Sequence, residues 1–361
     1  MQSKSGISKI AAMAIIIIVL AGTYYALNPQ TTITLIGAGA TFPEPLIKKW
    51  ASEYNKQNSS VAINYQGVGS GGGIQLIIRK IVDFAATDAP VKDEEMTSGY
   101  LVHIPETISA VVVVYNLPEL TGTLKLDGEA IAEIYLGKIT KWNDPKIVAL
   151  NPELSLLDEN IFVAHRSDGS GTTYIFTDYL STVSEEWSNE VGKGKSVNWP
   201  VGFGAQGNPG VAGLVQQHPY SIGYIEIAYV KITNITYAWI KNEFSEEFIE
   251  PTLASVSKAA EGFIEEMEED VRISIVNSPD PDAYPIASFT YILLHKEQNV
   301  YGASGSFEKS KSVLDFTWWA VHEGQDYSED LLYAKLPPQV VTICEDLLRS
   351  ITYNGQPIIT S

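Results

Sequence analysis

The chain has 361 residues, which exceeds one average domain and suits two lobes of ordinary size. A hydrophobic content of 45% and 28 glycines indicate a globular body and exclude a disordered or fibrous protein. The net charge of −19 argues against nucleic acid as a partner, because binding to nucleic acid depends on basic surface.

The first 30 residues have the pattern of a signal or a membrane anchor. Lys4 and Lys9 precede a largely apolar run over residues 10–27, which is long enough for a membrane-spanning helix. The positive flank predicts a cytoplasmic N-terminus and an exported remainder. No cysteine for lipid attachment and no clean small-residue cleavage site follow the run, which favours an uncleaved anchor over a removed signal. We therefore expect an extracytoplasmic protein, at the cell surface or in the periplasm, tethered by residues 10–27.

The exported body begins with a strand, a glycine-containing turn and a helix. Residues 32–36 predict the strand, and the sequence Gly-Ala-Gly-Ala-Thr-Phe-Pro follows at 37–43. Thr41 is expected at the cap of the helix, with its hydroxyl directed forward. After the prolines, one face of the helix is apolar at helical spacing and is formed by Leu46, Ile47, Trp50 and Tyr54.

A second unit of this kind follows. Residues 61–65 predict a strand, residues 66–73 form a glycine-rich turn that contains Ser70, and residues 74–81 predict a helix. A further short strand ends at Asp88. Strands that alternate with helices predict an α/β fold with parallel sheets and a ligand site at the carboxyl ends of the strands.

Two long apolar strands, at 108–115 and 289–295, predict the passages between two lobes. We expect the first strand to carry the chain into a second lobe and the second strand to bring it back. The predicted division assigns residues 31–107 plus 287–361 to lobe I and residues 108–286 to lobe II.

The stretch His-Arg-Ser-Asp-Gly-Ser-Gly-Thr at 165–172 lies between a short buried strand and the first turns of a helix. The first N–H groups of a helix lack an intrahelical acceptor, and the helix dipole favours negative charge at this end. Arg166 adds a charged, forked donor that suits a tetrahedral oxyanion. On its own, the stretch fits equally well an ordinary turn with Ser170 or Thr172 as a helix cap.

Several enzyme and cofactor sites compete with an anion site. Residues 67–72 match the G-x-G-x-x-G pattern of dinucleotide-binding folds, but the export segment and the remaining glycine turns argue against this interpretation. A serine hydrolase that uses Ser170 with His165 lacks the G-x-S-x-G elbow. The five scattered histidines and the single cysteine, Cys344, have no metal-ligand spacing. An exported enzyme that acts on phosphate esters or nucleotides through the same turns stays open as an alternative.

The glycine-containing turns and Asp88 all lie at strand ends, so they can converge on one anion in a cleft between the lobes. An acidic protein repels anions at long range, so such a site needs fixed donors that act at short range. Asp88 fits only a ligand that carries a proton, because a carboxylate repels a bare anion. Protonated phosphate can donate a hydrogen bond to Asp88, whereas sulfate at neutral pH cannot. The residues therefore favour phosphate over sulfate.

The sequence resembles the phosphate-binding proteins (PstS) of ABC-type phosphate importers. The resemblance covers nearly the whole exported body and is carried by segments in the family's order at 37–43, 64–73, 83–90, 135–144, 165–173, 197–208 and 223–229. It implies the type II periplasmic-binding-protein fold, with two lobes, two crossover strands and the ligand in the cleft between the lobes. It also implies a protein that binds without catalysis, has no cofactor, and delivers inorganic phosphate to the membrane subunits of an ABC phosphate permease.

The resemblance also implies a set of binding residues. In the family, phosphate is held by residues that match Thr41, Phe42 (through its N–H), Ser70, Asp88, Arg166, Ser170, Gly171 (through its N–H) and Thr172. Asp168 corresponds to the acid that pairs with the arginine. The sequence departs from the family pattern outside this set, with His165 in place of another polar or basic residue and Gly71 where serine is common.

Overall fold

The structure is a computed structural model that describes residues 32–96, 100–245, 247–267, 270–302 and 305–360. The apolar run at 10–27, predicted as a signal or anchor, lies outside the described residues. Within the described ranges, no helix combines the length and the apolar character needed to cross a membrane.

A mixed sheet of nine strands runs through the molecule. Neighbouring strands follow the order β2 (Val61–Gly67), β1 (Ile33–Gly39), β3 (Phe84–Thr87), β12 (Ala287–His295), β4 (Leu101–Asn116), β8 (Ser221–Glu226), β6 (Phe162–Arg166) and β7 (Phe203–Ala205), and β9 (Thr236–Tyr237) pairs with β4. β1 is parallel to β2 and β3, and β6 is parallel to β7 and β8. The sheet thus contains two parallel groups, which we call the β1 group (β2, β1, β3) and the β6 group (β8, β6, β7).

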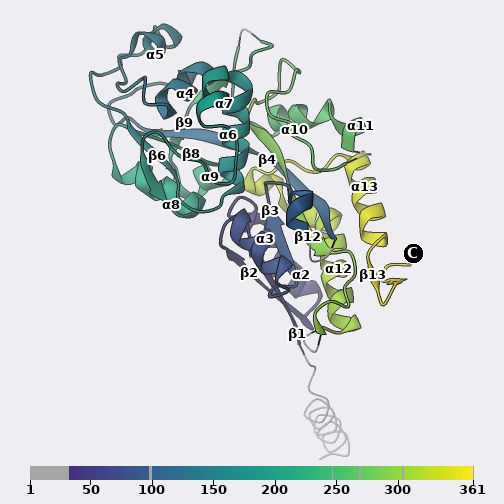
Figure 1. The fold of residues 1–361 in the computed structure, drawn as a ribbon. Coiled ribbons are helices and arrows are strands. Elements are labelled where there is room, and N and C mark those ends of the chain that lie inside the picture. Colours follow the sequence, from purple (N-terminus) through teal and green to yellow (C-terminus); the bar gives the residue numbers. More distant parts are fainter. Residues whose placement is uncertain (1–31, 97–99, 246, 268–269, 303–304, 361) are drawn as a thin grey trace, which may run out of the picture.

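β12 and β4 lie between the two parallel groups and are antiparallel to their neighbours. Residues 101–110 of β4 pair with β12, and residues 111–116 pair with β8. β4 is therefore the strand along which the chain passes from one group to the other, and it begins earlier than the predicted 108–115. Figure 1 shows the purple β1 group and the teal β6 group at opposite ends of the molecule, with β4 between them.

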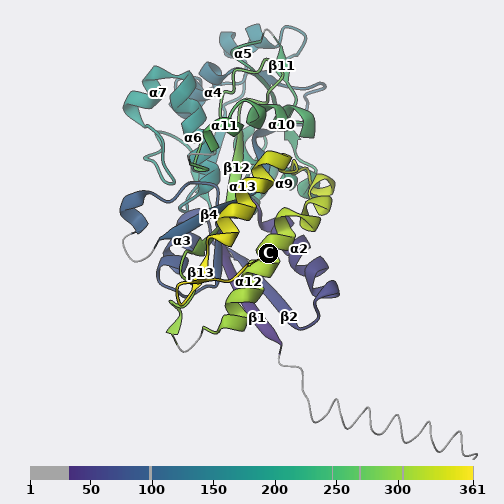
Figure 2. The same cartoon turned by 90° about the vertical axis from the view of Figure 1, so that its right-hand side faces the viewer.

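Helices cover both groups. Those that pack on the β1 group and its neighbouring strands are α2 (Glu44–Gln57), α3 (Ser70–Ile78), α12 (Phe307–Val321) and α13 (Pro338–Arg349). In Figure 2, α12 and α13 lie across the near face of the sheet. Those associated with the β6 group or the middle strands are α4 (Gly128–Tyr135), α6 (Gly171–Val183), α7 (Glu185–Glu190), α8 (Gly207–Gln217), α9 (Ala228–Thr233) and α10 (Leu253–Glu261).

Shorter elements complete the described chain. Two small sheets pair β5 (Lys125–Leu126) and β11 (Phe248–Ile249) with β10 (Trp239–Lys241), and β13 (Thr352–Tyr353) with β14 (Gln356–Pro357). The short helices are η1 (Asp93–Met96), α5 (Pro145–Leu150), α11 (Ile264–Met267), η3 (Glu323–Tyr327) and η4 (Glu329–Leu331).

The start of α2 shows one confirmed and one wrong prediction. The predicted apolar face is buried and consists of Leu46, Ile47, Trp50 and Tyr54. Thr41, however, is not the helix cap, because the N-cap is Pro43 and no side chain caps the helix. Proline in the first turn has no N–H that needs an acceptor, so the threonine hydroxyl is not required there. Its hydroxyl is left to serve another partner.

Candidate functional site

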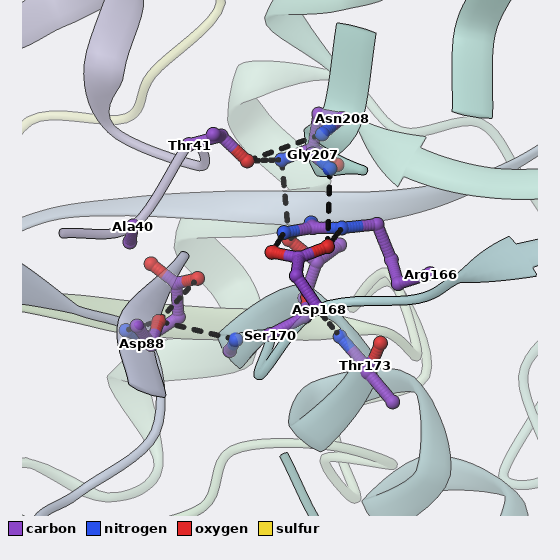
Figure 3. Close-up of polar contacts among 12 residues, drawn as sticks. Ala40, Thr41, Asp88, Arg166, Asp168, Ser170, Thr173, Gly207 and Asn208 are labelled. Atoms are coloured by element: carbon purple, nitrogen blue, oxygen red, sulfur yellow. Dashed lines mark hydrogen bonds and ion pairs between the residues drawn. The ribbon is translucent and has the colours of Figure 1, made fainter. Parts of the chain in front are cut away.

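The eight predicted binding residues lie at the carboxyl ends of parallel strands or at the starts of the helices that follow them. Those of the β1 group are Thr41 and Phe42 after β1, Ser70 at the start of α3 and Asp88 after β3. Those of the β6 group are Arg166 at the end of β6, Ser170 at the N-cap of α6, and Gly171 and Thr172 in its first turn. All eight are buried. Figure 3 shows Thr41 and Asp88 of the first set facing Arg166 and Ser170 of the second.

Glycines permit the two groups to approach this closely. The Gly71 N–H donates to the Gly169 carbonyl at 2.8 Å, which joins α3 to the turn before α6. A Cβ atom on Gly171 would lie 2.4 Å from both the Asp88 Oδ2 and the Ser70 Oγ atoms. Real Cβ atoms do not come so near to oxygen, so any side chain at position 171 would push the two groups apart.

Two threonine hydroxyls have their oxygen atoms occupied as acceptors. The Thr41 Oγ1 atom accepts from the backbone N–H and the side-chain amide of Asn208, both at 3.1 Å. The Thr172 Oγ1 atom accepts from the same amide and from the Arg166 Nη1 atom, both at 3.2 Å. Among the described residues, no acceptor takes either hydroxyl hydrogen. A hydroxyl whose lone pairs are used can only donate further, so both are ready to donate to an anion.

Two serines are arranged in a similar way. The Ser70 Oγ atom accepts from the backbone N–H groups of Gly171 and Asp88, at 3.1 and 3.3 Å. Its hydrogen has a distant acceptor in the Asp88 Oδ2 atom at 3.4 Å. The Ser170 Oγ atom caps α6 by accepting from the Thr173 N–H at 3.0 Å. The predicted cap interpretation of Ser170 and an anion-binding role are therefore compatible, because the cap uses the oxygen and leaves the hydrogen.

Arg166 forms the expected ion pair with Asp168. The guanidinium donates from Nε to Oδ1 at 2.8 Å and from Nη2 to Oδ2 at 2.5 Å, while Oδ1 also accepts from the Gly207 N–H at 3.0 Å. Burial raises the pKa of the Asp168 carboxyl, but Arg166 and the Gly207 N–H outweigh burial and leave this pKa below its ordinary value. Of the five guanidinium N–H groups, the described contacts to Asp168 and Thr172 use three. Two remain for a ligand.

Asp88 is the acid of the site and is almost fully buried, with 2% of its surface exposed. Its Oδ1 atom accepts from the Thr290 hydroxyl at 3.0 Å. Burial raises the pKa of this carboxyl to about 7, against the lowering effects of Thr290, Arg166 and Ser70. Near neutral pH a proton can therefore reside on either side of a contact between Asp88 and a protonated anion.

Comparisons with known proteins identify the family. A family model described as the PBP superfamily domain matches residues 26–321 of this chain. The phosphate-binding protein PstS of Haemophilus influenzae is 46% identical, over 89% of this chain and 95% of that protein. The chain belongs to the PstS family.

Solved structures share the fold of this PstS-family chain. An ABC-type phosphate transport receptor from Vibrio cholerae aligns with a TM-score of 0.54 at 19% identity, over 84% of this chain and 100% of that chain. A high affinity periplasmic phosphate-binding protein bound with phosphate aligns with a TM-score of 0.65 at 16% identity, over 88% and 99% of the two chains. The predicted type II periplasmic-binding-protein fold is thereby confirmed.

Asn208 is a residue of the site that the sequence reasoning missed. It lies in the first turn of α8, and its amide and backbone bridge Thr41 of the β1 group to Thr172 of the β6 group. Its Oδ1 atom accepts from the Glu226 N–H at 3.1 Å, which fixes the orientation of the amide. A signal was present in the sequence, because Gly207 and Asn208 form another glycine-containing helix start after a short strand.

Two tyrosines hold the turn at 41–42 from outside the predicted set. The Tyr229 hydroxyl donates to the Thr41 carbonyl at 2.6 Å, and the Tyr333 hydroxyl donates to the Phe42 carbonyl at 2.7 Å. The Tyr333 oxygen also lies 3.1 Å from the Glu226 Oε2 atom. Burial raises the pKa of Glu226 to about 8, so this carboxyl is largely protonated at neutral pH. Both tyrosines lie far along the chain from the turn, and no local pattern connects them to it.

The competing sites find no support in the described part of the chain. The His165 ring stacks on Trp199 with centroids 4.8 Å apart, and no described contact joins it to Ser170. Cys344 is buried in α13, where its thiol donates to the Pro105 carbonyl at 3.3 Å. Among the described residues, no three histidine, cysteine, aspartate or glutamate side chains are grouped so as to hold a metal ion.

Proposed function

We propose that this chain captures one inorganic phosphate ion outside the cytoplasm and delivers it to an ABC-type phosphate importer. The observation that carries the proposal is the donor arrangement, in which the oxygens of Thr41, Ser170 and Thr172 already accept hydrogen bonds. Three hydroxyl hydrogens and two guanidinium N–H groups of Arg166 are thus left for one tetrahedral oxyanion. The names of the relatives, as phosphate-binding proteins, point to the same ligand.

Asp88 selects phosphate among tetrahedral anions. Fixed donors alone accept phosphate and sulfate equally, because the two dianions share shape and charge. The buried Asp88 carboxylate needs a donor from the ligand, and only the protonated form of phosphate supplies one.

Binding is coupled to closure of two lobes, residues 31–107 plus 287–361 and residues 108–286. Contacts such as Gly71 to Gly169 and Asn208 to Thr41 join these two parts at the site. A ligand that adds further contacts on both sides stabilises the closed form over an open one. The membrane subunits of the importer recognise the surface of the closed form.

The remaining parts of the proposal concern location and chemistry. The protein is held at the membrane by residues 10–27 and works outside the cytoplasm, without nucleic acid. The site binds and does not catalyse, because the hydroxyl oxygens of Thr41, Ser170 and Thr172 already accept hydrogen bonds and these hydroxyls serve as donors.

Isothermal calorimetry on the exported body (residues 31–361) tests the proposal, with phosphate as titrant and then in the presence of sulfate. We expect one phosphate per chain and little competition from sulfate near pH 8. Absence of phosphate binding, or equal affinity for sulfate, would overturn the proposal. Turnover of phosphate esters by the same preparation would favour the enzyme alternative.

A further inference from the structure

A buried acid outside the predicted site reaches Asp88 through one hydroxyl. The Thr290 Oγ1 atom lies 3.0 Å from the Asp88 Oδ1 atom and 3.2 Å from the Glu106 Oε1 atom. Thr290 and Glu106 are fully buried, and the Glu106 Oε2 atom has no hydrogen-bond partner among the described residues. Two carboxyl groups therefore share a single buried threonine hydroxyl, and the Thr87 carbonyl oxygen, 3.3 Å from the same Oγ1 atom, is the more distant of its acceptors.

The backbone aims Glu106 at this hydroxyl by means of a β-bulge. In the pairing of β12 with β4, Thr290 lies opposite Thr107, but the next residue, Tyr291, lies opposite Pro105. Glu106 is the extra residue of the bulge and has no partner of its own. Bulges redirect side chains near functional sites. This bulge is fixed from outside by the Gln325 amide, which donates to the Glu106 carbonyl at 3.0 Å.

The proton count decides the direction of the hydrogen bonds. The Thr290 hydroxyl has one hydrogen, so it cannot donate to two ionised carboxylates. If Glu106 is neutral, its O–H donates to the Thr290 oxygen and Thr290 donates to Asp88. If Glu106 is ionised, it competes for the same hydrogen and places a second buried negative charge close to an anion site. With Asp88 ionised, as it is when it accepts from a protonated anion, only the first arrangement satisfies both contacts.

The surroundings of Glu106 also favour the neutral acid. The charged or titratable groups that face it are Asp88 at the end of β3 and Tyr65 in β2, whose hydroxyl donates instead to the Ala40 carbonyl at 2.8 Å. No cation among the described residues pairs with Glu106. Burial, and then the charge of Asp88, hold the pKa of Glu106 well above its ordinary range.

We propose that Glu106 is a positioning residue that stays protonated and, through Thr290, holds Asp88 as a hydrogen-bond acceptor directed at the ligand. The Glu106 O–H donates to Thr290, Thr290 donates to the Asp88 Oδ1 atom, and the Oδ2 atom is left for the proton of the ligand. The preference for a protonated anion thus depends on a residue that does not touch the ligand. This inference rests on the proposed function, because it assigns the origin of selectivity at the same site.

Infrared difference spectroscopy on the ligand-free protein near pH 7.5 tests the protonation state. We expect Glu106→Gln to remove a carbonyl band of a protonated carboxylic acid and to leave the carboxylate bands unchanged. Loss of carboxylate bands instead would overturn the proposal. Phosphate is not needed for this measurement, so its outcome is separate from the outcome for the proposed function.

Three variants test the role in selectivity by calorimetry with phosphate and sulfate. Glu106→Gln keeps a neutral donor and Thr290→Ser keeps the hydroxyl, so both should leave the ratio of affinities within about twofold of the unmodified protein. Thr290→Val removes the donor to Asp88 and should reduce the ratio by about tenfold. If the ratio of phosphate to sulfate affinity is the same in Thr290→Val as in Thr290→Ser, the hydrogen bonds from Glu106 through Thr290 to Asp88 have no role in selectivity. This outcome would refute the proposal even if Glu106→Gln fails to fold.

Discussion

Replacement of Asp88 by asparagine should abolish most of the preference for phosphate over sulfate. Asp88 is 2% exposed, so no water can satisfy its carboxylate when the ligand has no proton to donate. A hydrogen bond to a buried charged group is worth about 1.5–3 kcal/mol, which corresponds to a preference of roughly 10- to 150-fold. The amide of asparagine can donate from Nδ2 as well as accept at Oδ1, so it can satisfy sulfate. Because both ligands are dianions, removing one charge changes their attraction to the site equally and cancels in the ratio.

Calorimetric titration of phosphate and sulfate into both proteins near pH 8 measures this ratio. Asp158→Asn is the matched control, because it removes the same charge from a side chain that is 69% exposed and paired with Lys141 at the surface. We expect the ratio to fall by at least about tenfold in Asp88→Asn and to stay unchanged in Asp158→Asn. If Asp88→Asn binds phosphate with its selectivity intact, Asp88 is not the discriminating residue and the argument from its proton is wrong.

Four further predictions have defined outcomes. In Gly171→Ala the new Cβ would lie 2.4 Å from Ser70, so phosphate affinity should fall by about 10- to 100-fold in calorimetry, whereas Gly213→Ala, with open space at its Cβ, should not alter it. Arg166→Lys loses the forked donor and should weaken phosphate binding by at least about tenfold without changing the ratio to sulfate. The pKa of Asp88 is raised to about 7, so lowering the pH through 7 protonates it, lets it donate to sulfate, and should strengthen sulfate binding in competition titrations. Because the pKa of Asp88 is raised from its ordinary value of 3.8 to about 7 in the fold, the contribution of this residue to the stability of the ligand-free protein falls as the pH rises between these two values. Asp88→Asn should remove this dependence of stability on pH in thermal melts.

The order and type of the main elements could be predicted because their signals are local. The strand predicted at 61–65 is observed at Val61–Gly67 and the strand predicted at 289–295 at Ala287–His295, since apolar runs and flanking turns mark them in the sequence. The helix start at Ser170 could be located in the same way, whereas the helix predicted at 74–81 begins four residues earlier, at Ser70. One local signal gave a wrong prediction. Thr41 precedes a helix and has the pattern of a helix cap, but the proline that follows it removes the need for a side-chain cap.

The contacts that connect distant parts of the chain could not be predicted. The Asn208 amide bridges two threonines that are 167 and 36 residues away, and nothing in the local sequence chooses that partner among many asparagines. The approach of Glu106 to Thr290 depends on a one-residue shift in strand register, which hydrophobic alternation does not specify when a strand is buried on both faces. The convergence of the glycine turns and Asp88 on one anion was inferred from their places at strand ends, the full binding set was obtained from the family resemblance, and its role in binding stays a prediction.

The same atoms join the two parallel groups and face the proposed ligand. The Asn208 amide, by donating to Thr41 and Thr172, both links the groups and occupies the oxygens of two hydroxyls, whose hydrogens then turn to the ligand. If the groups separate, the Thr41 oxygen loses both of its donors, whereas the Thr172 oxygen keeps the Asn208 amide and Arg166, which lie in the same group. We therefore expect phosphate affinity and closure to depend on each other, because Asn208 occupies the oxygen of Thr41 only when the two groups are together. We expect the importer to distinguish loaded from unloaded protein by this coupling, because occupancy is the condition that favours the closed arrangement.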